Sequence, residues 1–315
     1  MVFKEIAMTA LNAPRFRDDQ KAREYLEALR WPNGPICPHC GSAAKPYALN
    51  GKATRPGVWK CSDCREQFTV TVGTVFERSK IPLSKWLTAT YLLCSSKKGM
   101  SSHQLHRTLG VTYKTAWFMT HRIREAMKDG NGSALGGPGT SGIVEANETY
   151  FGKTVGQGKG SHSAKKQKVV ALVERNSRVR AFHVPSVTAK TFKPILEGQI
   201  AESARLMIDD AAHFGKIGKA FKSHETVNHS AGEYARGDVT TNTVEGYFGI
   251  LKRGISGVYQ HVSPEHLNRY VNEFSFRYNN RTALGIEDAE RAANALKGIQ
   301  RKRLTYRRPG ETALV

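Results

Sequence analysis

The sequence predicts a multidomain protein in which a small α+β region precedes a larger α/β domain. Two observations carry this expectation. Two C-x-x-C pairs lie among short, alternating apolar stretches near the N-terminus, and a Gly-rich segment at 130–142 separates a helical region from one where strand and helix patterns alternate. Strands and helices that alternate along a chain typically pack as a mixed α/β layer. At 315 residues, the chain is long enough for two or three domains.

Periodicity and turn residues divide the chain into six segments. Apolar residues recur at helical spacing before residue 32, alternate as in short strands around the cysteines, and return to helical spacing after residue 85. Beyond the Gly-rich segment we expect strands at 143–151, 169–173, 179–184 and 205–208, and helices at 188–200, 242–251 and 264–278. The expected segments are a helical start at 1–32, a cysteine region at 33–80, a helical domain at 81–129, a flexible linker at 130–142, an α/β domain at 143–285 and an exposed basic tail at 286–315.

The charge balance points to a polyanionic partner. Lys and Arg number 48 against 27 Asp and Glu, which gives a net charge of +21 and a pI near 9.9. Such an excess suits nucleic acid or an anionic membrane. No apolar run approaches the roughly 20 residues that span a bilayer, and the N-terminus lacks the apolar core of a signal peptide. We therefore expect a cytoplasmic protein that binds nucleic acid and no membrane.

Four of the five cysteines form two C-x-x-C pairs, Cys37 with Cys40 and Cys61 with Cys64. Five cysteines are too few for a disulfide scaffold at this length. Each C-x-x-C turn can direct two thiolates at one ion, and two turns complete a tetrahedral zinc site. Four protein ligands leave no open position, so the sequence predicts a structural zinc ribbon. Cys94 lies in an apolar run and reads as a core residue.

The segment 101–117 has the pattern of two helices joined by a turn at Gly110. Apolar residues at 105, 109, 111 and 116 would pack between the helices, and a threonine can cap the second one. A plain helical hairpin is the alternative. Beside a metal ribbon and a strong positive charge, a helix-turn-helix that reads DNA is the better interpretation. Its expected DNA-facing residues are Tyr113, Lys114, His121 and Arg122, with Arg124 nearby.

Longer motifs in the second half resemble a known family. IVEANETYFG at 143–152, NHSAGEYARGD at 228–238, TNTVEGYFGILKRGISGVYQHVS at 241–263 and HLNRYVNEFSFRYNNR at 266–281 closely resemble the ISXO-like, Merlin-related insertion-sequence transposases. The order of ribbon, helix-turn-helix and α/β domain is similar to that family's layout. The resemblance implies an RNase H-like (retroviral integrase-like) core of the DDE type, in which three carboxylates hold two Mg²⁺ or Mn²⁺ ions for DNA cleavage and strand transfer.

The resemblance also implies which residues act. The second carboxylate corresponds to Asp209, with Asp210 as a competitor, and the third to Glu245 on a helix. Lys252 lies two helical turns after Glu245 on the same face, and in the family this lysine or neighbours such as Arg253 contact DNA phosphates. Oxygen ligands suit magnesium or manganese rather than the zinc of the ribbon.

The first catalytic position departs from the family pattern. Where the family has aspartate, this chain has Asn147, which lacks the negative charge of a bridging ligand. We expect weak metal binding and impaired catalysis. Glu145 could substitute, because residues 145 and 147 point to the same face of a strand, whereas Glu148 points the other way. An engineered inactivation and a natural decayed or repurposed copy both explain the asparagine.

Basic residues outside the motifs extend the expected DNA contacts. Lys153, Lys165 and Lys166 belong to a Gly-rich loop between the first two core strands, and each would add a salt-dependent phosphate contact if the loop lies along DNA. A solvated hairpin tip is the alternative. The same two interpretations, contact with DNA phosphates or exposure to solvent, apply to the basic residues of the tail, Arg301, Lys302, Arg303, Arg307 and Arg308. His229 precedes the catalytic helix and either contacts DNA or makes a structural hydrogen bond.

Taken together, the sequence predicts a DNA transposase. The expected partners are double-stranded DNA, as the inverted-repeat ends and the target, and a second protomer in a homodimer on DNA. The expected setting is the bacterial cytoplasm, in association with the nucleoid. A domesticated, non-catalytic DNA-binding regulator is the main rival, and Asn147 favours it if the residue is natural. A nuclease with the same core and a zinc-ribbon RNA-binding factor are further rivals, and the last leaves Asp209 and Glu245 unexplained.

Overall fold

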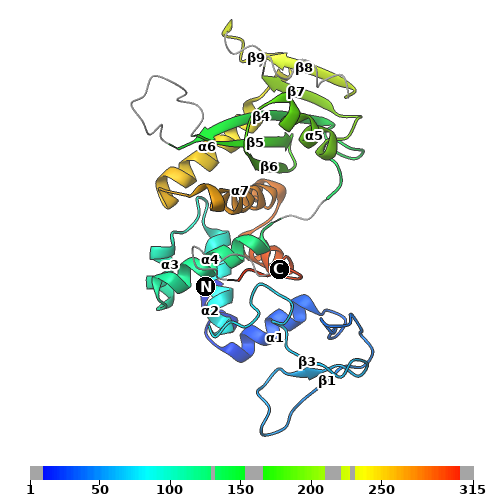
Figure 1. Ribbon diagram of the computed structural model, residues 1–315, viewed down its shortest axis with the longest axis vertical. Helices are drawn as coiled ribbons and strands as arrows, with labels where there is room; N and C mark the ends of the chain where they lie inside the picture. The colour runs from blue at the N-terminus through cyan, green and yellow to red at the C-terminus, as the bar shows by residue number, and fades with distance from the viewer. Residues whose placement is uncertain (1–9, 129–131, 153–165, 210–220, 228–230, 306–315) are drawn as a thin grey trace, which may run out of the picture. The chain divides into compact units, whose positions relative to one another are not determined.

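The chain folds as two compact units, one of which is inserted in the sequence of the other. The computed structural model describes residues 10–128, 132–152, 166–209, 221–227 and 231–305 (Figure 1). The first unit combines Met1–Lys128 with Glu287–Val315, and the second spans Asp129–Ile286. Among the described residues, no helix has the length and apolar character needed to cross a membrane.

The first unit begins with helices that support the cysteine region. Two 3-10 turns, η1 (Ala10–Asn12) and η2 (Pro14–Phe16), precede helix α1 (Asp19–Arg30). The Asp18 side chain caps α1 by accepting a hydrogen bond from the Lys21 N–H at 2.7 Å. Ala22 and Leu26 form the buried face of α1, so the helical spacing read from the sequence is confirmed.

A small sheet follows α1. Strands β1 (Tyr47–Ala48), β2 (Trp59–Lys60) and β3 (Gln67–Phe68) pair antiparallel in that order. The Arg30 guanidinium at the end of α1 donates to the carbonyls of Val70 and Val72 at 2.6 and 3.1 Å. The Trp31 ring meets Phe68 edge-on at 5.8 Å. These contacts attach the ribbon to α1, since two-residue strands bury too little surface to be stable alone.

Three helices complete the N-terminal part of the first unit. They are α2 (Leu83–Ser95), α3 (Ser102–Leu109) and α4 (Tyr113–Ala126). Gly110 ends α3 in the left-handed conformation at φ 60°, which glycine adopts without strain. The Thr112 hydroxyl then caps α4 through the Thr115 N–H at 3.2 Å. The expected pair of helices with a tight turn between them is therefore present.

The C-terminal segment differs from the exposed tail expected at 286–315. Asp288–Lys297 forms a helix, α8, that packs against α1, α2 and α4. Arg291 donates to the Cys94 carbonyl at 3.2 Å, and Lys302 donates to the Ala126 carbonyl at 3.0 Å. Ala292, Ala295, Leu296 and Ile299 are buried. Most apolar residues of α8 are alanines and the segment also carries several charged residues, so its sequence did not indicate a buried helix.

The second unit is built on a five-stranded sheet in the order β6-β5-β4-β7-β8 (Figure 1). Strands β4, β5 and β6 pair antiparallel, whereas β7 and β8 run parallel to β4. The strands are β4 (Ile143–Phe151), β5 (Gln167–Glu174), β6 (Val179–Val184), β7 (Arg205–Asp209) and β8 (Ser223–Val227). The sequence did not predict β8, because SHETV is polar, nor the short hairpin of β9 (Ala235–Arg236) and β10 (Val239–Thr240).

Helices cover both faces of this sheet. Helix α5 (Ala189–Gln199) packs against one face, where Phe192 and Leu196 meet the even-numbered residues of β4 and β5. The other face holds Ala171 and Val173 of β5 against α6 (Asn242–Gly254) and α7 (Pro264–Asn279). A π-helical turn, η5 (Ile255–Tyr259), continues α6, and a 3-10 turn, η6 (Thr282–Leu284), follows α7. The predicted mixed α/β core is confirmed.

The described part of the Gly-rich segment is held against the second unit rather than free. Leu135 is fully buried beside Leu196 and Ile200. Its N–H donates to the Gln199 carbonyl, and its carbonyl accepts from the Ala201 N–H, both at 2.8 Å. Gly136 has φ 73°, and a Cβ there would come within 2.5 Å of the Ala204 side chain. The burial of Leu135 and the close approach of Gly136 to Ala204 therefore hold this segment in place, although its composition predicted a flexible linker at 130–142.

Candidate functional site

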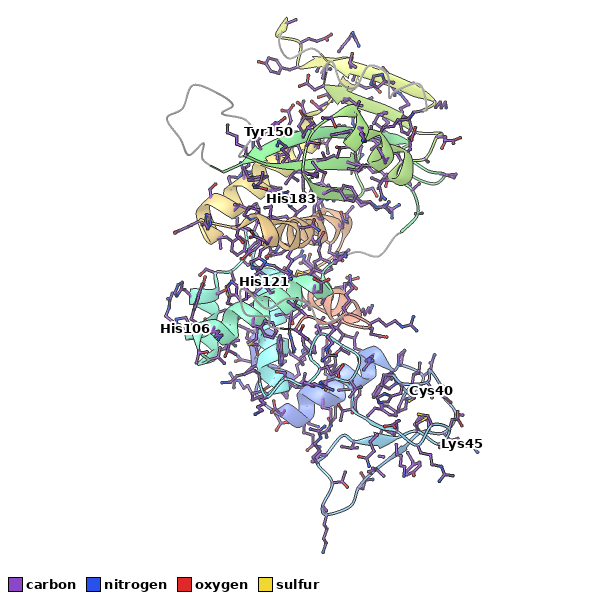
Figure 2. All side chains as sticks on the ribbon, viewed as in Figure 1. Cys40, Lys45, His106, His121, Tyr150 and His183 are labelled. Carbon is purple, nitrogen blue, oxygen red and sulfur yellow. The ribbon has the colours of Figure 1, made fainter. Side chains whose placement is uncertain are left out.

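Two candidate sites lie on the described residues, and the first is the cysteine cluster. The Cys37 and Cys64 sulfurs are 3.6 Å apart, as are those of Cys40 and Cys61. All four sulfurs lie within 4.8 Å of one another. Among the described residues they are the only group of three or more Cys, His, Asp or Glu side chains gathered this closely. Figure 2 labels Cys40 in this cluster.

The geometry of the cluster fits a tetrahedral zinc ion. A Zn–S distance of about 2.3 Å places tetrahedral sulfurs about 3.8 Å apart, close to the observed separations. Both knuckles turn through positive φ, at Gly41 (80°) and Arg65 (60°). A hydrogen bond from the Cys64 backbone N–H lowers the pKa of the Cys61 thiol to about 7, which favours the thiolate that a metal binds. The four cysteines would hold the zinc and leave no open coordination position.

The second candidate site lies where β4 meets β7. Their parallel register pairs Glu145 with Met207 and Ala146 with Ile208, and the next residues along the two strands are Asn147 and Asp209. Neighbouring strands are about 4.8 Å apart, and residues at the same step of a parallel pair point to the same face. Asn147 and Asp209 are both half-buried. The tertiary structure thus brings these two predicted residues side by side.

Helix α6 covers the face of the sheet that carries Asn147. Ala171, the cross-strand partner of Asn147, belongs to the apolar cluster formed with α6. Glu245 is in the first turn of α6 and is exposed. One of its oxygens accepts a hydrogen bond from the Thr241 hydroxyl at 2.9 Å. Asn147 and Asp209 thus lie on adjacent strands, and Glu245 lies in the first turn of the helix that covers the same face of the sheet. Oxygen donors of this kind suit Mg²⁺ or Mn²⁺.

Asn147 itself is turned toward its own backbone. Its side-chain oxygen accepts a hydrogen bond from the Glu148 N–H at 2.7 Å. An amide oxygen in this position has neither the charge nor the second oxygen with which a carboxylate bridges two ions. The site of the expected first carboxylate is therefore the weakest part of the donor set.

Glu145 does not offer a replacement ligand. It is 0% exposed, and its carboxylate accepts four hydrogen bonds, which is its full capacity. The donors are Arg175 Nε (2.6 Å), the Thr243 hydroxyl (2.8 Å), the Thr243 N–H (2.7 Å) and the Val244 N–H (3.0 Å). Sequence reasoning raised Glu145 as a candidate ligand but missed this structural role. The polar run TTNT before Glu245 was the signal that a capped helix begins there.

Lys252 and Arg253 lie in the last turn of α6 and are exposed. The Arg253 guanidinium lies back along the helix over Gly249, where a Cβ would be 3.6 Å from its nitrogens. Glu245, Gly249 and Lys252 are spaced by three or four residues and so share one helix face. An anion that approaches this face meets two cations near the donor set.

The pair α3–α4 presents only part of its expected DNA-facing set. Tyr113 and Lys114 are exposed at the start of α4, and the Tyr113 ring stacks on His103 of α3 at 4.2 Å. His106, on the same helix as His103, is labelled in Figure 2. Tyr113 and Lys114 thus lie on the solvent-exposed surface of the first unit.

His121 and Arg122 do not fit the expected surface role. Both are buried. The Arg122 guanidinium donates to the carbonyls of Glu77 and Leu304 at 3.1 and 3.2 Å, and the His121 ring packs on Trp117 at 4.1 Å. Burial lowers the pKa of Arg122. The helical periodicity placed the two residues near the surface side, but the C-terminal segment covers that part of α4.

Several predicted residues cannot be placed. Lys153 and Lys165, together with Asp210, His229, Arg307 and Arg308, lie outside the described residues. Lys166 is described and is half-buried just before β5. Arg301, Lys302 and Arg303 belong to the segment that packs on the first unit, where Lys302 caps the end of α4.

Comparison with known proteins gives a consistent picture. Residues 139–279 match the model of the ISXO2-like transposase domain, and residues 17–67 match that of the transposase zinc-ribbon domain. The chain is also 29% identical over 280 residues to an uncharacterised protein in transposable element ISH50 of Halobacterium salinarum, and the match covers 83% of this chain and 91% of that protein. The first model spans β4 to α7, and the second spans α1 and all four clustered cysteines.

Proposed function

The chain belongs to the ISXO2-like transposases, and from this we propose that it binds the ends of a mobile DNA element and carries the machinery for two-metal cleavage and strand transfer. The observation that carries the proposal is that Asn147 and Asp209 lie side by side on β4 and β7, while α6, which carries Glu245 in its first turn, covers the same face of the sheet. The strand order of the second unit, with three antiparallel strands and two parallel ones, supports an RNase H-like core.

The residues of the second unit have distinct parts in this proposal. Asp209 and Glu245, with the side chain at position 147, would hold two Mg²⁺ or Mn²⁺ ions, and such ions would supply the Lewis-acid chemistry of phosphodiester cleavage. Lys252 and Arg253 bind DNA phosphates on the same helix face. The neutral Asn147 weakens the donor set, so the chain as it stands binds ends but cleaves them poorly.

The first unit supplies DNA binding in this proposal. The zinc ion stabilises the ribbon, and the exposed start of α4, with Tyr113 and Lys114, enters the major groove as a recognition helix does. Lysine and arginine contacts to phosphates make the affinity fall steeply with salt. Because transposition joins two ends, we propose a homodimer on DNA, most simply with two-fold symmetry.

One observation favours a second function. If Asn147 is a natural residue, the chain suits a DNA-binding regulator that has lost cleavage but kept end recognition. The two functions make different predictions for a single substitution, since only the transposase regains activity when the carboxylate is restored.

The test is the Asn147→Asp variant, assayed for cleavage and joining of a labelled end substrate in Mg²⁺. We expect activity to rise by orders of magnitude over the chain as given, because each ~1.4 kcal/mol of transition-state stabilisation is tenfold in rate. End binding should be equal in both proteins. If both proteins cleave equally well, position 147 is not the first metal ligand; if neither cleaves, the regulator becomes the better function.

A further inference from the structure

The start of α6 is capped from the sheet and not by its own first residue. A helix N-terminus leaves several backbone N–H groups without partners inside the helix. Thr241, at the N-cap position, makes no side-chain hydrogen bond to these groups. Glu145 of β4 accepts them instead, from Thr243 and Val244 at 2.7 and 3.0 Å. The first turn of α6 is thereby fixed to β4, two residues before Asn147 on the same face.

Opposite charges stabilise the contact between β4 and the start of α6. The Glu145 carboxylate is fully buried between Arg175 Nε at 2.6 Å and the positive end of the α6 dipole. Arg175 also donates to the Thr240 carbonyl at 3.1 Å, so it holds the residue that leads into α6. A shift of α6 away from β4 would remove three of the four hydrogen-bond donors from this buried carboxylate, which is unfavourable.

The Thr241 hydroxyl does not cap α6 and instead bonds to Glu245. Thr241 is 0% exposed, and its hydroxyl donates to Glu245 Oε1 at 2.9 Å. Carboxylates that bind metals are normally oriented by such hydrogen bonds from residues that do not touch the ion. Glu145 and Thr241 thus control the place of the helix and the direction of its carboxylate, respectively.

We infer that Glu145 and Thr241 are positioning residues for the metal-binding role of Glu245. Glu145 sets the distance between Glu245 and the β4–β7 pair, and Thr241 orients one carboxylate oxygen. This inference rests on the proposed function, in which Glu245 is a ligand for a divalent cation. Neither residue touches the ion or the DNA.

The experiment compares full-length variants built on Asn147→Asp. Glu145→Gln removes the charge but keeps the shape, Thr241→Val removes only the hydroxyl, and Thr241→Ser keeps it. Glu174→Gln is the matched control, because Glu174 is also a 0% exposed glutamate of the sheet paired with an arginine, Arg178, yet it accepts from the Gly136 N–H and not from α6. Each protein is titrated with Mn²⁺ by calorimetry, and its melting temperature and end binding are measured.

Loss of a residue that orients a metal ligand typically costs 10- to 100-fold in metal affinity. We therefore expect Glu145→Gln and Thr241→Val each to weaken Mn²⁺ binding by roughly 10-fold or more, with end binding retained. Thr241→Ser should restore the Mn²⁺ affinity, and Glu174→Gln should leave it unchanged even where it lowers the melting temperature. Because serine keeps the hydroxyl but lacks the methyl group, recovery of Mn²⁺ affinity in Thr241→Ser would show that Thr241 acts by orienting Glu245 and not by packing.

Equal Mn²⁺ affinity in the parent and in Thr241→Val would overturn the inference, as would equal losses in Glu145→Gln and Glu174→Gln. If Glu145→Gln does not fold, Thr241→Val and Thr241→Ser decide the question without it. A parent that binds Mn²⁺ but does not cleave DNA would overturn the proposed function while the positioning roles stand, whereas a parent that binds no Mn²⁺ would overturn both.

Discussion

The cysteine cluster and the proposed carboxylate site would each hold a metal, but the two sites are built in opposite ways. The four cysteines come from two local turns, and each turn contributes both of its sulfurs from residues three apart. The carboxylate site takes one residue each from β4, β7 and α6, and a buried ion pair fixes the helix to the strand. A local site is complete once its turns form, whereas a site drawn from β4, β7 and α6 depends on the contacts that place these elements next to one another.

The largest effect should come from breaking the local site. Cys61→Ser removes one of four ligands, and structural zinc in comparable small domains contributes on the order of 10 kcal/mol to folding. We expect loss of bound zinc and an unfolded ribbon, with the second unit intact. Atomic emission should find one zinc per chain before the change, and limited proteolysis should locate the damage. Cys94→Ala, outside the cluster, is the control and should retain zinc. A native chain purified without chelator and found to lack zinc would contradict the assignment.

Substitutions in the proposed carboxylate site should reduce DNA cleavage and leave folding nearly unchanged. In the Asn147→Asp background, Asp209→Asn and Glu245→Gln should each lower cleavage on the order of 10³-fold, equivalent to about 4 kcal/mol, with little change in melting temperature or end binding. Glu148→Gln, on the opposite face of β4, is the matched control. Activity that survives either ligand substitution would refute the donor set.

A third prediction concerns how far the first unit depends on its C-terminal segment. Leu296→Ala should lower the free energy of unfolding by about 2–5 kcal/mol, because Leu296 of α8 is buried and its truncation leaves a cavity. A fragment that ends at Lys128 should fold poorly, whereas 1–128 joined to 287–315 through a flexible linker should melt cooperatively. Calorimetry distinguishes the two fragments. A fragment 1–128 as stable as the joined protein would show that α8 is dispensable.

The smallest expected effect is a change in the salt dependence of end binding, which distinguishes the exposed Lys114 of α4 from the buried Arg122. Lys114→Ala should reduce the slope of log affinity against log salt by about 1, because one phosphate contact is lost. Arg122→Ala should leave the slope unchanged but cost about 1–3 kcal/mol of stability, since the carbonyls of Glu77 and Leu304 lose their buried donor. End binding titrated over a range of salt concentrations, together with melting curves, measures both. If Arg122→Ala instead lowers the salt slope and leaves the stability unchanged, Arg122 contacts DNA.

The sequence by itself determined what local spacing and local periodicity encode. The C-x-x-C pairs predicted the cysteine cluster, because two thiolates three residues apart can bind one ion and a second pair completes a tetrahedral site. Alternation of apolar residues predicted strands β4 to β7, and helical spacing predicted α1 to α7, since burial of one face forces that period. The motifs at 143–152 and 241–263 indicated the transposase family.

Only the tertiary structure decided which polar residues are buried and which partners they meet. Arg122 and Glu145 read as surface or metal-facing residues, but long-range hydrogen bonds commit them to the core. The helix at Asp288–Lys297 and the anchoring of Leu135 depend on surfaces formed by residues distant in sequence. A charged side chain can be buried only where distant groups compensate it, and no local pattern records which groups those are.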